Sequence, residues 1–159
     1  MTDALEVQVG ERLKALNATV ATAESCTGGL IASRLTDISG SSAYVEGGVV
    51  SYSNAVKERL LNVSPQTLID HGAVSEPTAR EMALGARALF GVDYAVSVTG
   101  IAGPDGGTPE KPVGLTYIGV AWSGGVEVQR HVWMGSRVEN KLSSADAAFR
   151  LLLKVMSIE

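Results

Sequence analysis

The chain has 159 residues, 45% hydrophobic and 19% charged, as expected for one globular domain over residues 1–159. Its net charge of -4, without a basic cluster, argues against a nucleic-acid partner. Cys26 is the only cysteine, which excludes an internal disulfide and favours a reducing, cytoplasmic location. No apolar run reaches the roughly 18 residues of a membrane span, and the acidic N-terminus is unlike a signal peptide, so no membrane association is expected.

The first elements are predicted from local apolar spacing. Apolar residues three and four apart predict a helix over residues 5–16. A short buried strand is expected over residues 18–23. Residues 27–29 open a second helix, which is expected to stop near residues 39–40. The pattern is strand, tight turn and helix.

A second strand is expected over residues 44–52, where Gly47 and Gly48 indicate a bulge or a close backbone approach. Asn54 is the expected cap of the short helix that follows. The residues expected to face inward from that helix are Val56, Leu60 and Leu61.

The middle of the chain contains the clearest helix signal. Ser75 and Pro77 are a capping residue and a first-turn proline, and an apolar stripe runs from there to Phe90. A strand is expected over residues 93–98. It continues into residues 99–108, which are too rich in glycine for a helix or a ladder.

Two strands over residues 113–122 and 126–133 flank a glycine turn, which predicts a hairpin at one edge of the sheet. A closing helix is expected over residues 138–155. Helices and strands alternate throughout the chain. We therefore expect an α/β domain, a three-layer α/β/α sandwich on a mixed, partly antiparallel sheet of about five to six strands.

Ser25 is the candidate nucleophile, because it follows a strand and precedes a helix, whose N-terminus offers N–H donors and positive charge. The alternative is that Ser25 or Thr27 merely caps the helix. Cys26 is a rival nucleophile, since a thiol at a helix N-terminus would have a lowered pKa. A lone cysteine is more often a small buried apolar residue, and we rank Cys26 below Ser25.

A serine hydroxyl needs a base, and the histidines offer little support for a His-based triad. His71 is expected in a loop, and His131 is expected to be structural in a strand. A Ser-Lys arrangement is the natural substitute, because a desolvated lysine can accept a proton. Lys57 is the candidate, with Tyr52 five residues earlier to share a proton relay; the alternative is an ordinary surface lysine.

The loop over residues 99–108 could bind phosphate through successive N–H groups, although it matches neither the P-loop nor the dinucleotide-binding pattern. A plain structural loop is the alternative. Asp105 lacks a second carboxylate at ligand spacing, so no metal site is expected.

Four motifs in order resemble one family, the CinA C-terminal domain family of nicotinamide-nucleotide amidases. The motif residues are Ala23 to Gly29, Gly48 to Lys57, Gly72 to Ser75, and Thr99 to Gly107 with Lys111 to Gly114. The resemblance implies a three-layer α/β/α domain that hydrolyses the carboxamide of nicotinamide mononucleotide to nicotinic acid mononucleotide and ammonia. It implies no metal or other cofactor, and a homodimer or higher homo-oligomer.

The resemblance also implies roles for individual residues. The catalytic residues would be Ser25, Tyr52 and Lys57. The expected oxyanion or substrate-binding residues are Cys26, Thr27, Gly28, Gly29, Thr99, Gly100, Gly106, Gly107 and Lys111. The segment Gly135-Ser136-Arg137, followed by Lys141, departs from the usual family pattern of an acidic residue before the arginine and a second arginine one turn later. A nucleotide-binding regulatory module without amidase activity is the alternative function.

Overall fold

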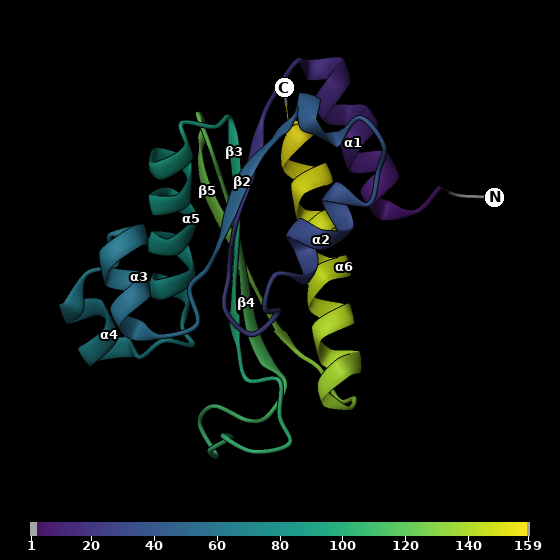
Figure 1. Cartoon of the computed structure of the whole chain (residues 1–159). Helices are drawn as coiled ribbons and strands as arrows, with labels where there is room; N and C mark the ends of the chain where they lie inside the picture. The colour runs from purple at the N-terminus through teal and green to yellow at the C-terminus, as the bar shows by residue number, and fades with distance from the viewer. Residues whose placement is uncertain (1–2, 159) are drawn as a thin grey trace.

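The computed structural model describes residues 3–158 (Figure 1). The elements in chain order are α1 (Leu5–Leu16), β1 (Val20–Glu24), α2 (Leu30–Thr36), the 3-10 helix η1 (Ser41–Ala43), β2 (Val45–Val50), α3 (Asn54–Leu61), α4 (Pro65–His71), α5 (Glu76–Phe90), β3 (Tyr94–Gly100), β4 (Leu115–Trp122), β5 (Gly125–Val132) and α6 (Arg137–Met156). Most lie within a few residues of the predicted ranges.

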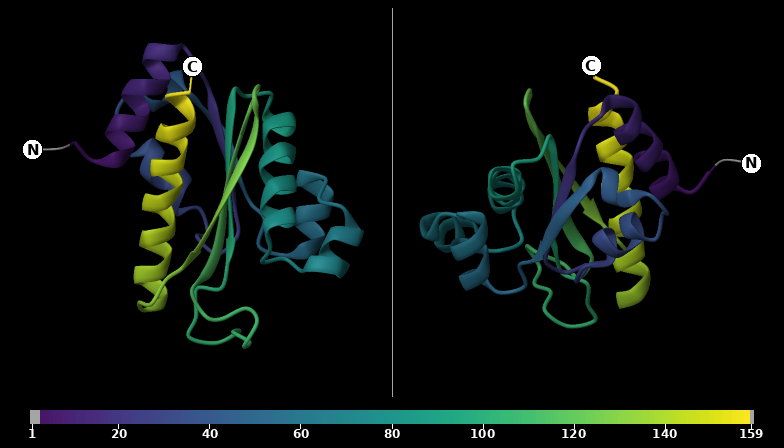
Figure 2. Two further views of the ribbon diagram at one scale, coloured as in Figure 1. Left: turned by 180° about the vertical axis from the view of Figure 1, so that it is seen from behind. Right: turned by 45° about the horizontal axis from the view of Figure 1, so that its top comes forward.

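The strands form one mixed sheet in the order β2-β1-β3-β4-β5. β1 pairs in parallel with β2 and β3, whereas β4 pairs antiparallel with both β3 and β5. Helices α1, α2 and α6 cover one face, and α3, α4 and α5 lie on the other (Figures 1 and 2). The expected three-layer mixed α/β fold, with the hairpin of β4 and β5 at an edge, is confirmed.

Apolar residues at the sheet centre explain why this order is stable. Every residue of β1 is buried, because helices cover both of its faces. The larger core cluster lies between the sheet and α6, where Phe149 and Leu152 are buried. A smaller cluster under α5 includes Met82 and Ala86.

The glycine pair in β2 behaves as predicted. Pairing with β1 shifts register between Val45 and Gly47, so Glu46 is one extra residue in the strand. A Cβ atom on Gly48 would lie 2.3 Å from the Thr22 hydroxyl oxygen, so no larger residue fits beside β1 there.

The α3 to α4 region differs from the prediction. Ser53, not Asn54, caps α3 by accepting a hydrogen bond from the Val56 amide. The helix is also rotated, so that Lys57 and Leu61, four residues apart, face inward, while Leu60 is 43% exposed.

Helix α4 was not predicted, and it includes His71, which was expected in a loop. The signal was present, since Pro65 occupies the first turn of α4.

Three parallel strands end at the same edge of the sheet, which positions the candidate site. Glu24, Val50 and Gly100 are the last residues of β1, β2 and β3. Ligands in open α/β sheets bind beyond such carboxyl ends. Among residues 3–158, no helix has the length and apolar character that crossing a membrane would need.

Candidate active site

The segment between β1 and α2 forms a tight turn that presents Ser25. The Ser25 amide donates to the Val98 carbonyl at 2.9 Å, and the Gly28 amide donates to the Ser25 carbonyl at 3.1 Å. Gly28 and Gly29 have φ angles of 62° and 105°, which glycine adopts without steric cost. Ser25 therefore extends the pairing of β1 with β3 by one residue, and the chain then turns into α2.

Glu24 holds this turn from inside the protein. Its buried carboxylate accepts hydrogen bonds from the Thr27 hydroxyl at 2.6 Å and from the amides of Ile31 and Ala32 at 2.9 Å. Helix α2 begins at Leu30, so these amides belong to its first turn. From the sequence, the N–H donors at the α2 N-terminus were expected to surround the Ser25 side chain. This expectation is wrong for the amides of Ile31 and Ala32, because both already donate to Glu24.

Lys57 reaches the same point from α3. Its side chain is only 1% exposed. The ammonium nitrogen lies 3.2 Å from Ser25 Oγ, 2.8 Å from the Ser51 carbonyl oxygen and 3.3 Å from the Tyr52 carbonyl oxygen. The predicted convergence of Lys57 on Ser25 is present, and the surface-lysine alternative is wrong.

The surroundings of Lys57 favour its neutral form. Burial lowers the pKa of the Lys57 ammonium from its ordinary value. A neutral amine has two N–H groups and one lone pair. The two carbonyl oxygens can accept both hydrogens, which directs the lone pair at the Ser25 hydroxyl.

Tyr52 is placed differently from the prediction. Its side chain is 61% exposed, and it contacts Lys57 through its main-chain carbonyl. Its hydroxyl accepts a hydrogen bond from Arg137 at 3.3 Å. The phenol therefore lies at the rim of the site, paired with a residue of α6.

Cys26 shares the turn but is buried in the core cluster. Burial raises the pKa of its thiol to about 11, which is opposite to the lowered pKa that a helix N-terminus was expected to produce. Its sulfur would lie 3.1 Å from a Cβ atom on Gly100. The thiol is thus packed close to the end of β3 and protonated at neutral pH.

These side chains line a cleft of about 270 Å³ at the carboxyl ends of the parallel strands. Its lining includes Ser25, Cys26, Tyr52 and Lys57, together with Thr99, Gly100 and residues of the following loop as far as Gly106. The Thr99 hydroxyl donates to the Ala73 carbonyl at 2.7 Å. The end of β3 and the loop after it therefore form a wall of the cleft, and phosphate binding by this loop stays a prediction.

Helix α6 anchors this wall. The Asn140 amide group donates to the Ala102 carbonyl at 3.0 Å, and Arg137 donates to the Gly103 carbonyl at 2.7 Å. Figure 1 shows the long loop between β3 and β4 projecting beyond the sheet at the same end as the start of α6. Arg137 lines the cleft and contacts both the loop and Tyr52.

Some predicted residues lie elsewhere. The Lys111 ammonium donates to the His71 carbonyl, and Lys111 is not among the residues that line the cleft. Gly107 packs against Val113, where a Cβ atom would lie 2.7 Å from a main-chain nitrogen. His131 stacks on Trp133 at the edge strand, with ring centroids 4.7 Å apart. Neither histidine lines the cleft.

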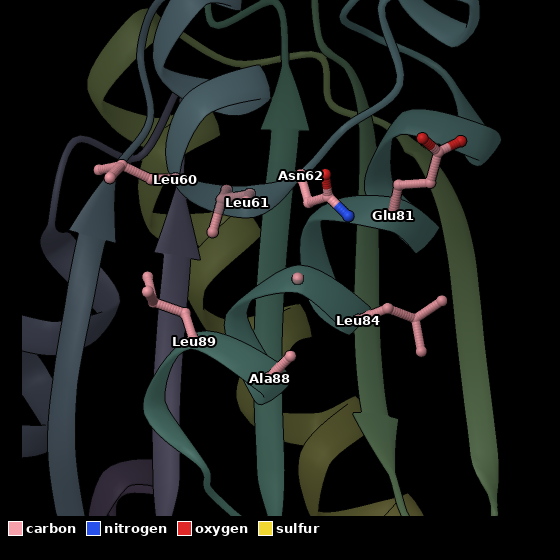
Figure 3. Close-up of a pocket in the computed structure, with 8 residues that line it drawn as sticks. Leu60, Leu61, Asn62, Glu81, Leu84, Ala88 and Leu89 are labelled. Atoms are coloured by element: carbon pink, nitrogen blue, oxygen red, sulfur yellow. The ribbon is translucent and has the colours of Figure 1, made fainter.

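Within residues 3–158, no group of three or more His, Cys, Asp or Glu side chains is placed to hold a metal ion. A second cavity lies between α3 and α5, well away from Ser25. It is an apolar groove lined by Leu60, Leu84 and Leu89 (Figure 3). Its one acidic residue, Glu81, already accepts hydrogen bonds from Ser64 and Thr67, so the groove offers no free catalytic group.

Sequence reasoning gave Glu24 no role in the site, although a local signal existed, since it is a carboxylate at the end of a buried strand, directly before a helix. Arg137 was noted only as part of a segment that departs from the family pattern. Its pairing with Tyr52 had no local signal, because the two residues are 85 positions apart in the chain.

Comparisons with known proteins identify the family of this chain. Residues 2–156 match the family model of the CinA C-terminal domain. The chain is 54% identical over 134 residues to a protein of Escherichia coli K12 named nicotinamide-nucleotide amidohydrolase PncC, covering 82% of this chain and 81% of that protein. It is 50% identical over 150 residues to a putative competence-damage inducible protein of Moorella thermoacetica, covering 94% of this chain.

The chain spans only 36% of the Moorella protein, so that relative is much longer. Among solved structures, the competence/damage inducible protein CihA of Agrobacterium tumefaciens superposes with a TM-score of 0.90 at 41% identity, covering 97% of each chain. A CinA superfamily protein of Klebsiella pneumoniae gives a TM-score of 0.94 at 33% identity, covering 98% of this chain and 97% of that one. The chain belongs to the CinA C-terminal domain family.

Proposed function

We propose that this protein hydrolyses the carboxamide of nicotinamide mononucleotide, giving nicotinic acid mononucleotide and ammonia. The observation that carries the proposal is the buried Lys57 nitrogen 3.2 Å from Ser25 Oγ. The E. coli relative named nicotinamide-nucleotide amidohydrolase supports the choice of substrate.

In the first half-reaction, neutral Lys57 accepts the Ser25 hydroxyl proton while the serine oxygen attacks the carboxamide carbon. The tetrahedral intermediate collapses, the bond from carbon to nitrogen breaks, and Lys57 returns the proton to the leaving ammonia. Water then attacks the acyl-enzyme with Lys57 again as base. This releases the acid and restores Ser25.

Negative charge develops on the amide oxygen in both steps. Gly28 was one expected donor, but its amide already binds the Ser25 carbonyl. The amides of Cys26 and Thr27 are therefore the candidates, and Cys26 lines the cleft. One well-placed donor contributes roughly 3 kcal/mol in other hydrolases.

Tyr52 and Arg137 act at the rim in this proposal. The hydrogen bond from Arg137 polarises the phenol and holds it beside the cleft. In this position the Tyr52 ring can orient the bound nucleotide. A proton relay from the Tyr52 hydroxyl to Lys57 would require the bound substrate to move the ring into the cleft.

The test measures ammonia release from nicotinamide mononucleotide by purified wild-type protein, Ser25→Ala and the control Ser42→Ala. Ser42 is an exposed serine of η1. We expect turnover in the wild type and the control, and none in Ser25→Ala. Nucleotide binding without ammonia release in the wild type would contradict the amidase and support the regulatory module.

The rival nucleophile is tested in the same assay. Cys26→Ala should retain turnover, because the mechanism uses only the main-chain amide of that residue. Iodoacetamide should leave the wild-type rate unchanged at neutral pH, since a thiol of pKa about 11 is protonated there. Loss of activity in both experiments would assign the chemistry to the thiol.

A further inference from the structure

Lys141 is a cation beside the nucleophile turn that the proposed reaction does not use. It lies in α6, one helical turn after Arg137. Its ammonium nitrogen is 3.8 Å from the position that a Cβ atom on Gly28 would occupy. Gly28 is exposed, so the ammonium borders an open part of the turn that carries Ser25.

The charge of Lys141 is uncommitted. Across residues 3–158, no hydrogen bond or ion pair engages its ammonium. The nearest acidic residue on the same helix, Glu139, has its carboxylate on the Ser136 amide in the capping box. Arg137, by contrast, is held by the Gly103 carbonyl and the Tyr52 hydroxyl.

The cleft beside Ser25 is small for a whole nucleotide. Its volume is about 270 Å³, whereas sites for drug-sized ligands run from ~300 to 1,000 Å³. With the carboxamide at Ser25, part of the nucleotide must extend out of the cleft. The phosphate is its most hydrophilic and most charged part, so it is the group that belongs outside, near a free cation.

We propose that Lys141 binds the phosphate of the substrate across Gly28 and makes the enzyme selective for nicotinamide mononucleotide over the unphosphorylated riboside. This proposal rests on the proposed function. Gly28 leaves room for the phosphate to reach the ammonium, because a side chain there would occupy the space between them. Lys111, one of the expected substrate-binding residues, has its amine at the His71 carbonyl instead.

The experiment compares kcat and KM for nicotinamide mononucleotide and nicotinamide riboside in the wild type, Lys141→Met and Lys154→Met. Lys154 is an exposed lysine of the same helix, paired with Glu127, and it controls for loss of a positive charge. We expect Lys141→Met to lower kcat/KM for the mononucleotide by about 10-fold to 100-fold, mainly through KM, as for loss of a charge-assisted hydrogen bond. The riboside should be unaffected, and Lys141→Arg should recover most of the loss.

Equal losses for the two substrates, or no loss for the mononucleotide, would overturn the subsite. If the wild type releases no ammonia from either compound, the amidase proposal fails and the subsite is tested by binding. Nicotinamide mononucleotide should then raise the unfolding temperature of the wild type more than that of Lys141→Met, and the riboside should raise both equally. The same rise in both proteins with the mononucleotide, or none in either, would overturn the subsite independently.

Discussion

Glu24 shows how one buried carboxylate can determine where the proposed nucleophile, Ser25, lies. It joins the end of β1 to the first turn of α2 and to Thr27, so the turn that carries Ser25 is held at both ends. The helix dipole is compensated by this carboxylate rather than by a substrate. Its effect on the reaction is therefore through the position of Ser25.

We predict that Glu24→Gln lowers kcat by about 10-fold or more and destabilises the fold by about 2 kcal/mol. Glutamine keeps the size but turns one oxygen into an NH2 group that faces N–H donors. The measurements are the rate per folded molecule and the urea midpoint, with Glu46→Gln on exposed β2 as the matched control. A Glu24→Gln protein that loses stability but keeps its rate would limit this residue to a structural role.

In the proposed mechanism, Lys57 makes both the rate and the stability depend on pH. Because burial lowers its pKa, the folded protein holds fewer protons than the unfolded chain between the folded pKa and the ordinary value near 10.5. The free energy of unfolding therefore rises with pH across that window. Below the folded pKa, the protein bears the full cost of burying a charged lysine. The rate should rise through the same folded pKa, since only the neutral amine accepts a proton.

We predict that Lys57→Met lowers the rate by ~10²–10⁴-fold and makes the protein more stable than the wild type at low pH. The stability difference should narrow by up to about 1.4 kcal/mol per pH unit as the pH rises through the window. Urea unfolding at several pH values measures this. A difference that stays constant with pH would mean that Lys57 is charged in the folded protein.

At the scale of elements, the placement of Lys57 depends on how closely α3 approaches α5. Gly85 of α5 makes that approach possible, since a Cβ atom there would lie 1.8 Å from the Leu61 carbonyl oxygen. The backbone of α3 would have to move to accept any side chain. Gly85 therefore lies in the middle of α5 because only glycine allows the α3 backbone to pack this close.

We predict that Gly85→Ala is destabilising and lowers kcat, although alanine favours helix by about 1 kcal/mol over glycine. The displaced α3 would carry Lys57 away from Ser25. Thermal unfolding and ammonia release measure the two effects, with Leu84→Ala at the adjacent, partly exposed position as control. A Gly85→Ala protein with a raised melting temperature and an unchanged rate would contradict the packing argument.

Local patterns predicted most elements but not their rotation. A capping residue and a first-turn proline predicted the start of α5, and apolar spacing predicted α6. Both signals depend only on residues close together in the sequence. The inward face of α3 was assigned wrongly at Leu60, since α3 buries a lysine where an apolar residue was expected. The usual expectation that lysine is exposed fails at Lys57, because its side-chain nitrogen is hydrogen-bonded to main-chain carbonyls.

The site was predictable to the extent that it is local. Ser25 and Lys57 were identified from the turn and from chemistry, whereas the Tyr52 partner Arg137 and the orientation of Lys111 depend on contacts between distant segments. Such contacts carry no spacing signal. The same reason left the role of α6 in the cleft outside the sequence prediction.

At the scale of the whole molecule, the homo-oligomer implied by the family resemblance stays a prediction. Several large hydrophobic side chains are exposed on the surface of this chain. Association would bury part of this apolar surface, which is favourable. Sedimentation equilibrium should give at least twice the 16.5 kDa mass of the chain. A mass of one chain across the concentrations used for the rate measurements would show that the site works within one copy.

The two amides next to the proposed dyad are bonded across the sheet: Ser25 to the Val98 carbonyl, and Ser51 to the Glu24 carbonyl. Their hydrogens can exchange with solvent only when these inter-strand bonds open. Ser25, and the Ser51 segment whose carbonyl binds Lys57, are therefore both tied to the sheet. Partial unfolding of the outer helix α4 or of the loop between β3 and β4 would leave these two inter-strand bonds in place.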